Sequence, residues 1–114
     1  MYSKIILAGY LGGDPDLRYT PKGEAVCNFS VAASAGKDDT IWFRVTAWGN
    51  QAEACGQYLH KGSLVLVEGR LTHDGRGNPR IFERKSGEHG SAFEVTASNV
   101  RFLGGGMGEQ MVAE

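Results

Sequence analysis

The chain has 114 residues, enough for one domain that buries about two-thirds of the surface its unfolded form exposes, without support from a metal ion or a disulfide. Its 12 Lys and Arg residues nearly balance 13 Asp and Glu residues, which excludes a globally basic protein, so any basic surface for nucleic acid must be local. The 17 glycines and 3 prolines are typical of a β protein with many turns.

Cysteine usage and hydropathy indicate the compartment. Cys27 and Cys55 are far apart in the chain and lack the spacing of a metal site, so we predict two buried thiols in a reducing environment. The apolar run at residues 5–8 is short, and no stretch reaches the length of a membrane span. We therefore expect a soluble cytoplasmic protein that is not exported.

The first two predicted strands lie in the N-terminal third of the chain. The apolar segment KIILAG, Lys4 to Gly9, ends at the glycine-rich turn GYLGGDP and is typical of a strand. In the segment from Ala25 to Ala33, apolar and polar residues alternate, with Cys27, Phe29 and Val31 on the apolar face. This alternation predicts a strand with one face in a core.

The third predicted strand, TIWFRVTAWGN from Thr40 to Asn50, has an unusual face. Successive side chains of a strand point to opposite sides. One side is apolar and predicts a core face: Ile41, Phe43, Val45 and Ala47. The other side, which we call the tryptophan face, consists of Trp42, Arg44, Thr46 and Trp48. Two indoles are unusual in contact with water, and a buried Arg needs a partner, so this face calls for a specific role.

One helix and two further strands follow. Asn50 and Glu53 have the spacing of a capping box, and Gly62 fits a left-handed stop, so a helix of about three turns is predicted between them. Its apolar side consists of Ala52, Ala54, Tyr58 and Leu59. The last two strands are predicted from Ser63 to Leu71 and from Ala92 to Leu103.

Two segments are predicted to lie outside the packed core. The segment from Thr72 to Ser91 contains four glycines and several cations, so we predict a long, locally basic hairpin between the fourth and fifth strands. Its cations are Arg76, Arg80, Arg84 and Lys85. Residues 104–114 are expected to form a flexible glycine-rich tail that follows a single domain of residues 1–103.

The predicted order of three strands, a helix and two strands is that of an OB-fold. This all-β fold is a five-stranded Greek-key barrel with the helix between strands three and four. Other small barrels share the strand pattern, and the position of the helix separates this fold from most of them. An OB-fold presents the middle of its sheet to oligonucleotides, which is where the tryptophan face would lie.

Three uses of the tryptophan face remain open: packing in the core or at a subunit interface, a small-molecule pocket, and stacking on nucleic-acid bases. Six residues at about 3.3 Å each separate the two indoles by roughly 20 Å. This separation is too large to hold one small ligand between the rings but suits a stretched strand of several nucleotides. The spacing therefore favours base stacking by Trp42 and Trp48.

Four segments, in order and almost without gaps from Tyr2 to Leu103, resemble the bacterial-type single-stranded DNA-binding protein family. They are ILAGYLGGDPDLRYTPKGEAVCNFSVAAS, WFRVTAWGNQAE, YLHKGSLVLVEGRL and FEVTASNVRFL. The resemblance implies three residues that stack on bases: Trp42, Trp48 and Phe82. It also implies that Arg44, Arg18 and Lys61 lie near the DNA backbone, and the basic hairpin adds Arg80 and Arg84 as backbone contacts.

By the same resemblance, we expect sequence-tolerant binding and protection of single-stranded DNA in replication, recombination and repair. The expected assembly is a homotetramer, with a dimer as the alternative, in the bacterial cytoplasm at the nucleoid. The segment SAGKDDT lacks an aromatic residue that many members carry before the third strand. The sequence ends at MVAE, so replication and repair proteins are expected as partners only if a longer natural chain carries an acidic tip.

Two other functions remain open: a primosome-type or RNA-binding OB module, and a structural OB domain whose aromatic residues contact proteins. The residues do not indicate an enzyme, a metal site or a cofactor. His60, His73 and His89 lack ligand spacing, and no Ser or Cys lies in a nucleophile context. Asp38 and Asp39 are neighbours on a predicted turn, where their side chains point apart.

Overall fold

The computed structural model of the protein describes residues 3–36, 39–79, 81–83, 87 and 89–103. In this part of the chain there are eight strands and one helix. In chain order they are β1 (Ile5–Leu11), β2 (Asp16–Tyr19), β3 (Ala25–Gly36), β4 (Asp39–Trp48), α1 (Asn50–Tyr58), β5 (Leu64–Leu71), β6 (Ile81–Glu83), β7 (His89–Ser91) and β8 (Phe93–Phe102).

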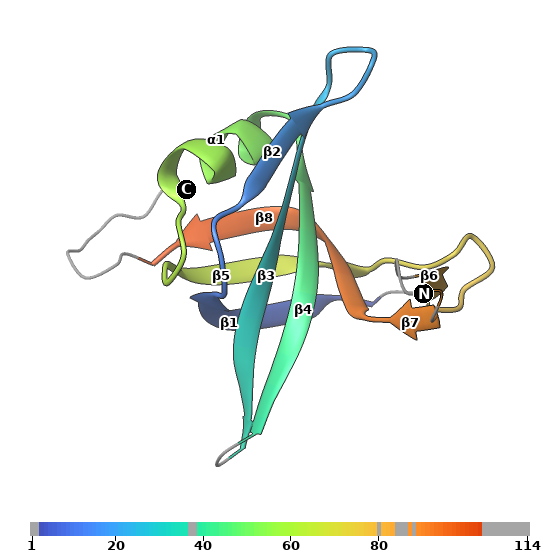
Figure 1. The fold of residues 1–114 in the computed structure, drawn as a ribbon. Coiled ribbons are helices and arrows are strands. Elements are labelled where there is room, and N and C mark those ends of the chain that lie inside the picture. The colour runs from blue at the N-terminus through green and yellow to red at the C-terminus, as the bar shows by residue number, and fades with distance from the viewer. Residues whose placement is uncertain (1–2, 37–38, 80, 84–86, 88, 104–114) are drawn as a thin grey trace.

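Five of the strands close into a barrel (Figure 1). They are hydrogen-bonded in the order β1, β5, β8, β4 and β3, and β3 returns to β1 through the pairs Tyr10–Ala32 and Leu11–Val31. β4 and β8 run parallel, whereas the other neighbours in the barrel are antiparallel. In the described part of the chain, α1 is the one helix, and it follows the strand that bears the tryptophans. The predicted OB-fold is confirmed.

The N-terminal third contains more strand than the sequence predicts. β1 continues past Gly9 to Leu11, and β3 continues past Ala33 to Gly36. β2 is an unpredicted strand, and its Arg18 pairs with Val26 of β3. β3 has 12 residues, long enough to pair with β2 along its first part and with β1 farther on. The glycine-rich segment between β1 and β2 therefore connects two strands that both pair with β3.

Helix α1 lies where it is predicted, but both of its ends differ from the prediction. Gly49 is the N-cap, with a φ of 70°, and no side chain caps the helix, so the capping box at Asn50 is wrong. The helix has nine residues, about two and a half turns, and ends at Tyr58 because Leu59 is extended and buried in the core. Gly62 is therefore not the helix stop; its φ of 90° belongs to the turn that leads into β5.

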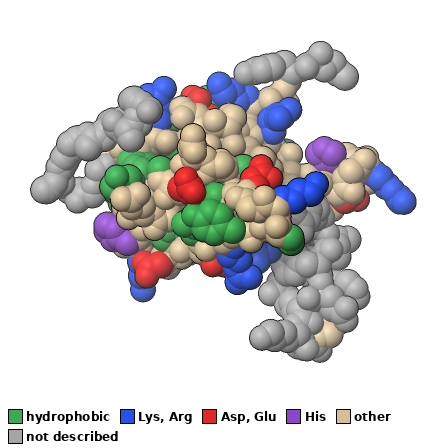
Figure 2. Space-filling model, turned by 90° about the horizontal axis from the view of Figure 1, so that it is seen from above, with side chains coloured by type: hydrophobic (Ala, Val, Ile, Leu, Met, Phe, Trp, Pro, Cys, Tyr) green, Lys and Arg blue, Asp and Glu red, His purple; other side chains and the backbone are tan. Residues whose placement is uncertain are grey.

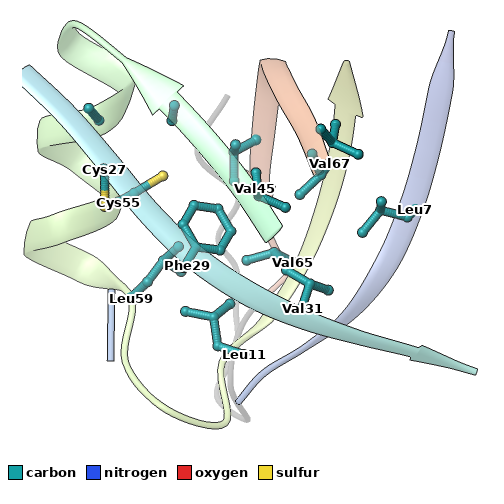
Figure 3. Packing of buried hydrophobic residues seen from close by; sticks show 14 of the residues in the cluster. Leu7, Leu11, Cys27, Phe29, Val31, Val45, Cys55, Leu59, Val65 and Val67 are labelled. Atoms are coloured by element: carbon teal, nitrogen blue, oxygen red, sulfur yellow. The ribbon is translucent and has the colours of Figure 1, made fainter. Parts of the chain in front are cut away.

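Alternate residues of the barrel strands and one side of α1 form the core (Figure 3). Five valines have no exposed surface: Val31, Val45, Val65, Val67 and Val95. Cys27 of β3 and Cys55 of α1 are also fully buried, where the helix covers the barrel. Burial raises the pKa of Cys27 to about 11 and that of Cys55 to about 12, so both are neutral thiols at physiological pH. The prediction of two buried thiols is confirmed.

The segment between β5 and β8 contains a separate two-stranded sheet. β6 pairs with β7 in antiparallel register, away from the barrel (Figure 1). Where this segment leaves the barrel, the Thr72 N–H donates to the Glu94 carbonyl oxygen at 2.8 Å, and the Thr72 and Thr96 hydroxyls lie 2.7 Å apart. The predicted long hairpin is thus confirmed, whereas the predicted tail at residues 104–114 lies outside the described residues.

Candidate nucleic-acid interface

The tryptophan face lies on the outside of the barrel. Val45 and Ala47, which point the other way from β4, are fully buried. Trp42 is 53% exposed and Trp48 is 42% exposed. Packing of these indoles in the core of this chain is therefore excluded, and an interface with another subunit or stacking on a ligand remains open.

Neighbouring strands extend the tryptophan face into cross-strand rows, because side chains at paired positions lie next to each other. The rows are Ala32 with Trp42, Ser30 with Arg44 and Glu94, Asn28 with Thr46 and Thr96, and Arg18 with Val26 and Trp48. The residues that β3 contributes between the two indoles are small or polar. On the β3 side, the surface between the rings therefore consists of short side chains, which leave room for flat groups such as bases.

A groove of about 600 Å³ lies beside the tryptophan face. It is lined by residues 12–14 of the β1–β2 connection, residues 28–30 of β3, and side chains of β4 and β8. Those side chains are Trp42, Arg44, Thr46 and Glu94. The groove thus gathers one indole, one cation and several hydrogen-bonding groups from four separate segments of the chain.

Polar contacts in the groove hold these side chains in place. Arg44 Nη1 lies 3.6 Å from Glu94 Oε2, and the Glu94 side chain is only 12% exposed. The Thr46 hydroxyl donates to Asn28 Oδ1 at 2.8 Å. The carboxylate of Glu94 offsets part of the positive charge of Arg44, so this cation alone provides a modest attraction for phosphate.

The other two predicted cations on the barrel lie at the borders of this surface. Arg18 shares a row with Trp48, and its Nε lies 2.9 Å from Asp16 Oδ2 in an exposed ion pair. The backbone N–H of Lys61 donates to Asp14 Oδ1 at 2.9 Å, and Asp14 lines the groove. Both residues are exposed, as a contact with a phosphate backbone requires.

Of the binding residues predicted in the hairpin, the structure describes only the backbone of Phe82. The backbone of Phe82 lies in β6, where it pairs with Gly90 of β7. Arg80 and Arg84 lie outside the described residues. A role for these three residues in binding therefore stays a prediction.

Sequence reasoning missed three parts of the groove. Residues 12–14 belong to the motif LGGDP, which predicts only a turn. In the sequence, Asn28 is one of several polar residues on an exposed strand face, and nothing distinguishes it from the others. Glu94 precedes a core valine in an alternating strand, so nothing local marks it as a partner of Arg44. The strand register that joins these residues is a property of the folded barrel.

Other kinds of site find no support in the described part of the chain. No group of three or more His, Cys, Asp or Glu side chains there is placed to hold a metal ion. The helix that is described is too short and polar to cross a membrane. Figure 2 shows acidic and basic side chains interspersed over one face of the molecule, in keeping with the near balance of charges in the composition.

A closed five-stranded barrel, a helix after its third strand and exposed aromatic residues on the third strand define an OB-fold domain with an aromatic groove. The chain belongs to the single-strand binding protein family, whose model matches residues 2–103. The resemblance found in the sequence is thereby confirmed.

Named relatives are similar to most of this chain. The single-stranded DNA-binding proteins of Neisseria meningitidis serogroups A and B are each 42% identical to it over 111 residues, which cover 90% of this chain and 60% of each relative. Single-stranded DNA-binding protein 1 of Chlorobaculum tepidum is 39% identical over 111 residues, which cover 90% of this chain and 65% of the relative. The chain thus spans less than two-thirds of the length of these relatives.

Proposed function

We propose that this chain binds single-stranded DNA along the groove and the tryptophan face, with little sequence preference. It would thereby cover exposed strands during replication, recombination and repair. The observation that carries this proposal is the exposure of Trp42 and Trp48 on one strand, with Arg44 between them. Membership of the single-strand binding protein family supports it.

Stacking accounts for tolerance of sequence, because every base offers a π-face to an indole. A strand that runs along β4 would place one base on Trp42 and another on Trp48, with the intervening sugar-phosphate backbone near Arg44. Arg18 and Lys61 would contact phosphates at the borders. Because Glu94 partly neutralises Arg44, stacking would contribute a larger share of the binding free energy and the attraction between charges a smaller share.

The hairpin is proposed as a third contact. Phe82 would stack on a further base, and Arg80 and Arg84 would contact the backbone as the hairpin closes over the strand. The separate β6–β7 sheet supports this idea, since a segment with its own pairing can move without disturbing the barrel.

We further propose a homotetramer. The outer side of β1 carries Ile6, 59% exposed, and Tyr10, 58% exposed. On β5, Leu64 pairs with Tyr10, Leu66 pairs with Ala8, and Glu68 pairs with Ile6 at the end of the row. Such a largely apolar sheet surface with a charged border is typical of an interface, and a second copy of the chain would cover it. Replication and repair proteins are proposed as partners only of a chain with an acidic tip. With DNA as the ligand, the proposed location is the bacterial cytoplasm, at the nucleoid.

Competition separates this function from the alternatives. A fluorescent oligo(dT) bound to the protein is challenged with unlabelled poly(dT), duplex DNA and single-stranded RNA. We expect poly(dT) to displace the probe at the lowest concentration and duplex DNA to be ineffective. Stronger displacement by RNA would indicate an RNA-binding module. No binding of any of these nucleic acids would indicate a structural domain whose aromatic residues contact proteins.

A further inference from the structure

Gly12, in the connection between β1 and β2, lies directly against the indole of Trp42. A Cβ atom at Gly12 would be 2.5 Å from Trp42 Cζ3 and 2.8 Å from Cη2, well inside the 3.5–4.0 Å at which carbon atoms pack. These two atoms form part of the outer edge of the six-membered ring. The edge of the indole therefore occupies the space that any other side chain at position 12 would need.

The backbone at this position is anchored on two sides. The Gly12 N–H donates to the Ser30 carbonyl oxygen at 3.1 Å, and the preceding Leu11 N–H donates to the Ser63 carbonyl oxygen at 2.9 Å. The φ of Gly12 lies outside the left-handed region, so alanine fits the backbone itself. Because the backbone is held and the indole is 53% exposed, an added methyl group would displace the ring and leave the barrel intact.

We propose that Gly12 is a positioning residue for base stacking: the gap left by its missing side chain seats the edge of the Trp42 indole and fixes the direction in which the ring faces the groove. The inference rests on the proposed binding of single-stranded DNA. It adds the residue that orients Trp42, one of the two indoles proposed to stack on bases. A ring held in one orientation binds a base with less loss of conformational entropy than a mobile ring.

Gly13 provides a matched control. It lines the same groove, but a Cβ atom there would meet nothing within 4 Å. Gly13→Ala thus adds the same methyl group to the same groove without touching the indole. We expect Gly12→Ala to weaken binding of oligo(dT) by about tenfold, within the range for loss of one stacked base, and Gly13→Ala to weaken it less, because its methyl group does not touch the indole. Both variants should keep a thermal midpoint close to that of the parent.

A double-mutant cycle tests the mechanism. Trp42→Phe removes the ring edge that contacts position 12, so Gly12→Ala should have no effect on affinity in that background. An equal loss of affinity in both backgrounds, or an equal loss from Gly13→Ala, would overturn the proposal. If the Gly12→Ala variant does not fold, the Gly12→Ala/Trp42→Phe double variant should fold. Failure of both variants to fold would show that the added methyl group conflicts with the backbone, which also overturns the proposal.

A measurement without DNA separates this inference from the proposed function. The chain has two tryptophans, so Trp48→Phe leaves Trp42 as the sole indole. In that background, Gly12→Ala should shift the emission maximum and increase quenching by acrylamide, and Gly13→Ala should do neither. If the emission responds in this way but the protein does not bind oligo(dT), the DNA-binding function is refuted and the positioning role of Gly12 stands. Unchanged emission with Gly12→Ala would refute the positioning role even if DNA binds.

Discussion

Replacing Trp42 and Trp48 by alanine, one at a time, tests the central feature of the proposed interface. Loss of one stacked base costs about 1–3 kcal/mol, which corresponds to roughly 5- to 150-fold weaker binding. The indoles are 53% and 42% exposed. If about half of a side-chain area of roughly 250 Å² is buried, truncation costs at most about 3 kcal/mol of folding free energy. A domain of ordinary stability, about 5–15 kcal/mol, remains folded after such a loss.

Intrinsic fluorescence provides the assay. Poly(dT) should quench the parent strongly, because both tryptophans of the chain lie on the proposed surface, and each variant should retain the quenching of its remaining indole. Titrations at several salt concentrations should give the same slope of log affinity against log salt for parent and variants, since no phosphate contact is lost. Thermal unfolding of each variant provides the control for folding.

The result that would refute this reasoning is an alanine variant that keeps full affinity for poly(dT) but no longer forms the oligomer. If Trp42→Ala or Trp48→Ala dissociates the assembly, shown by sedimentation, while binding per folded chain is unchanged, the indole belongs to a subunit interface. The exposure of the ring in the single chain would then reflect the absence of its neighbour.

Three further predictions concern charge, the thiols and assembly. Arg44→Ala should weaken binding and reduce the slope of the salt dependence by about 0.7 for one lost phosphate contact, whereas Arg44→Lys should retain most of the slope; an unchanged slope with alanine would contradict a phosphate contact. Because the pKa values of Cys27 and Cys55 are raised to about 11 and about 12 from 9.0, their contribution to stability is complete below pH 9 and is lost as the pH rises through these values. Urea unfolding from pH 8 to 10.5 should therefore show a falling free energy of unfolding, and a smaller fall in Cys55→Ala. Ile6→Glu should place a charge on the apolar outer side of β1 and reduce the assembly to a smaller species in sedimentation, with the barrel still folded; an unchanged mass would place the interface elsewhere.

The barrel and the orientation of β4 were predictable because their signals are local. Alternation of large apolar and other residues around Phe43 and Val45 predicts which side of β4 faces the core, and the structure buries Val45 and Ala47 fully and packs the half-buried Phe43 against the core. Ile41, predicted on the same side, is only half-buried and lies outside the core cluster. The ends of α1 were not predictable in this way. Burial of Leu59 draws the chain out of the helix before Gly62 is reached, and burial depends on the packing of the whole barrel.

The same distinction applies to the site. Trp42 and Trp48 stand out because two indoles on an exposed strand face are rare. The contact of Gly12 with Trp42 and the pairing of Arg44 with Glu94 join residues that are far apart in the sequence. Each depends on the register between neighbouring strands, which cannot be predicted from the spacing of residues within one segment. The hairpin residue Phe82 remains a prediction drawn from family resemblance.

The position of β8 in the barrel has a consequence for the order of events during synthesis. β8 is the last of the described strands to be made, yet it lies between β5 and β4 and completes the row of Arg44 with Glu94. A nascent chain that has not yet released residues 93–102 from the ribosome has two open strand edges and an incomplete groove. The proposed DNA-binding surface can therefore form only after nearly all of residues 1–103 have been translated, and until then the nascent chain exposes strand edges that can pair with other chains.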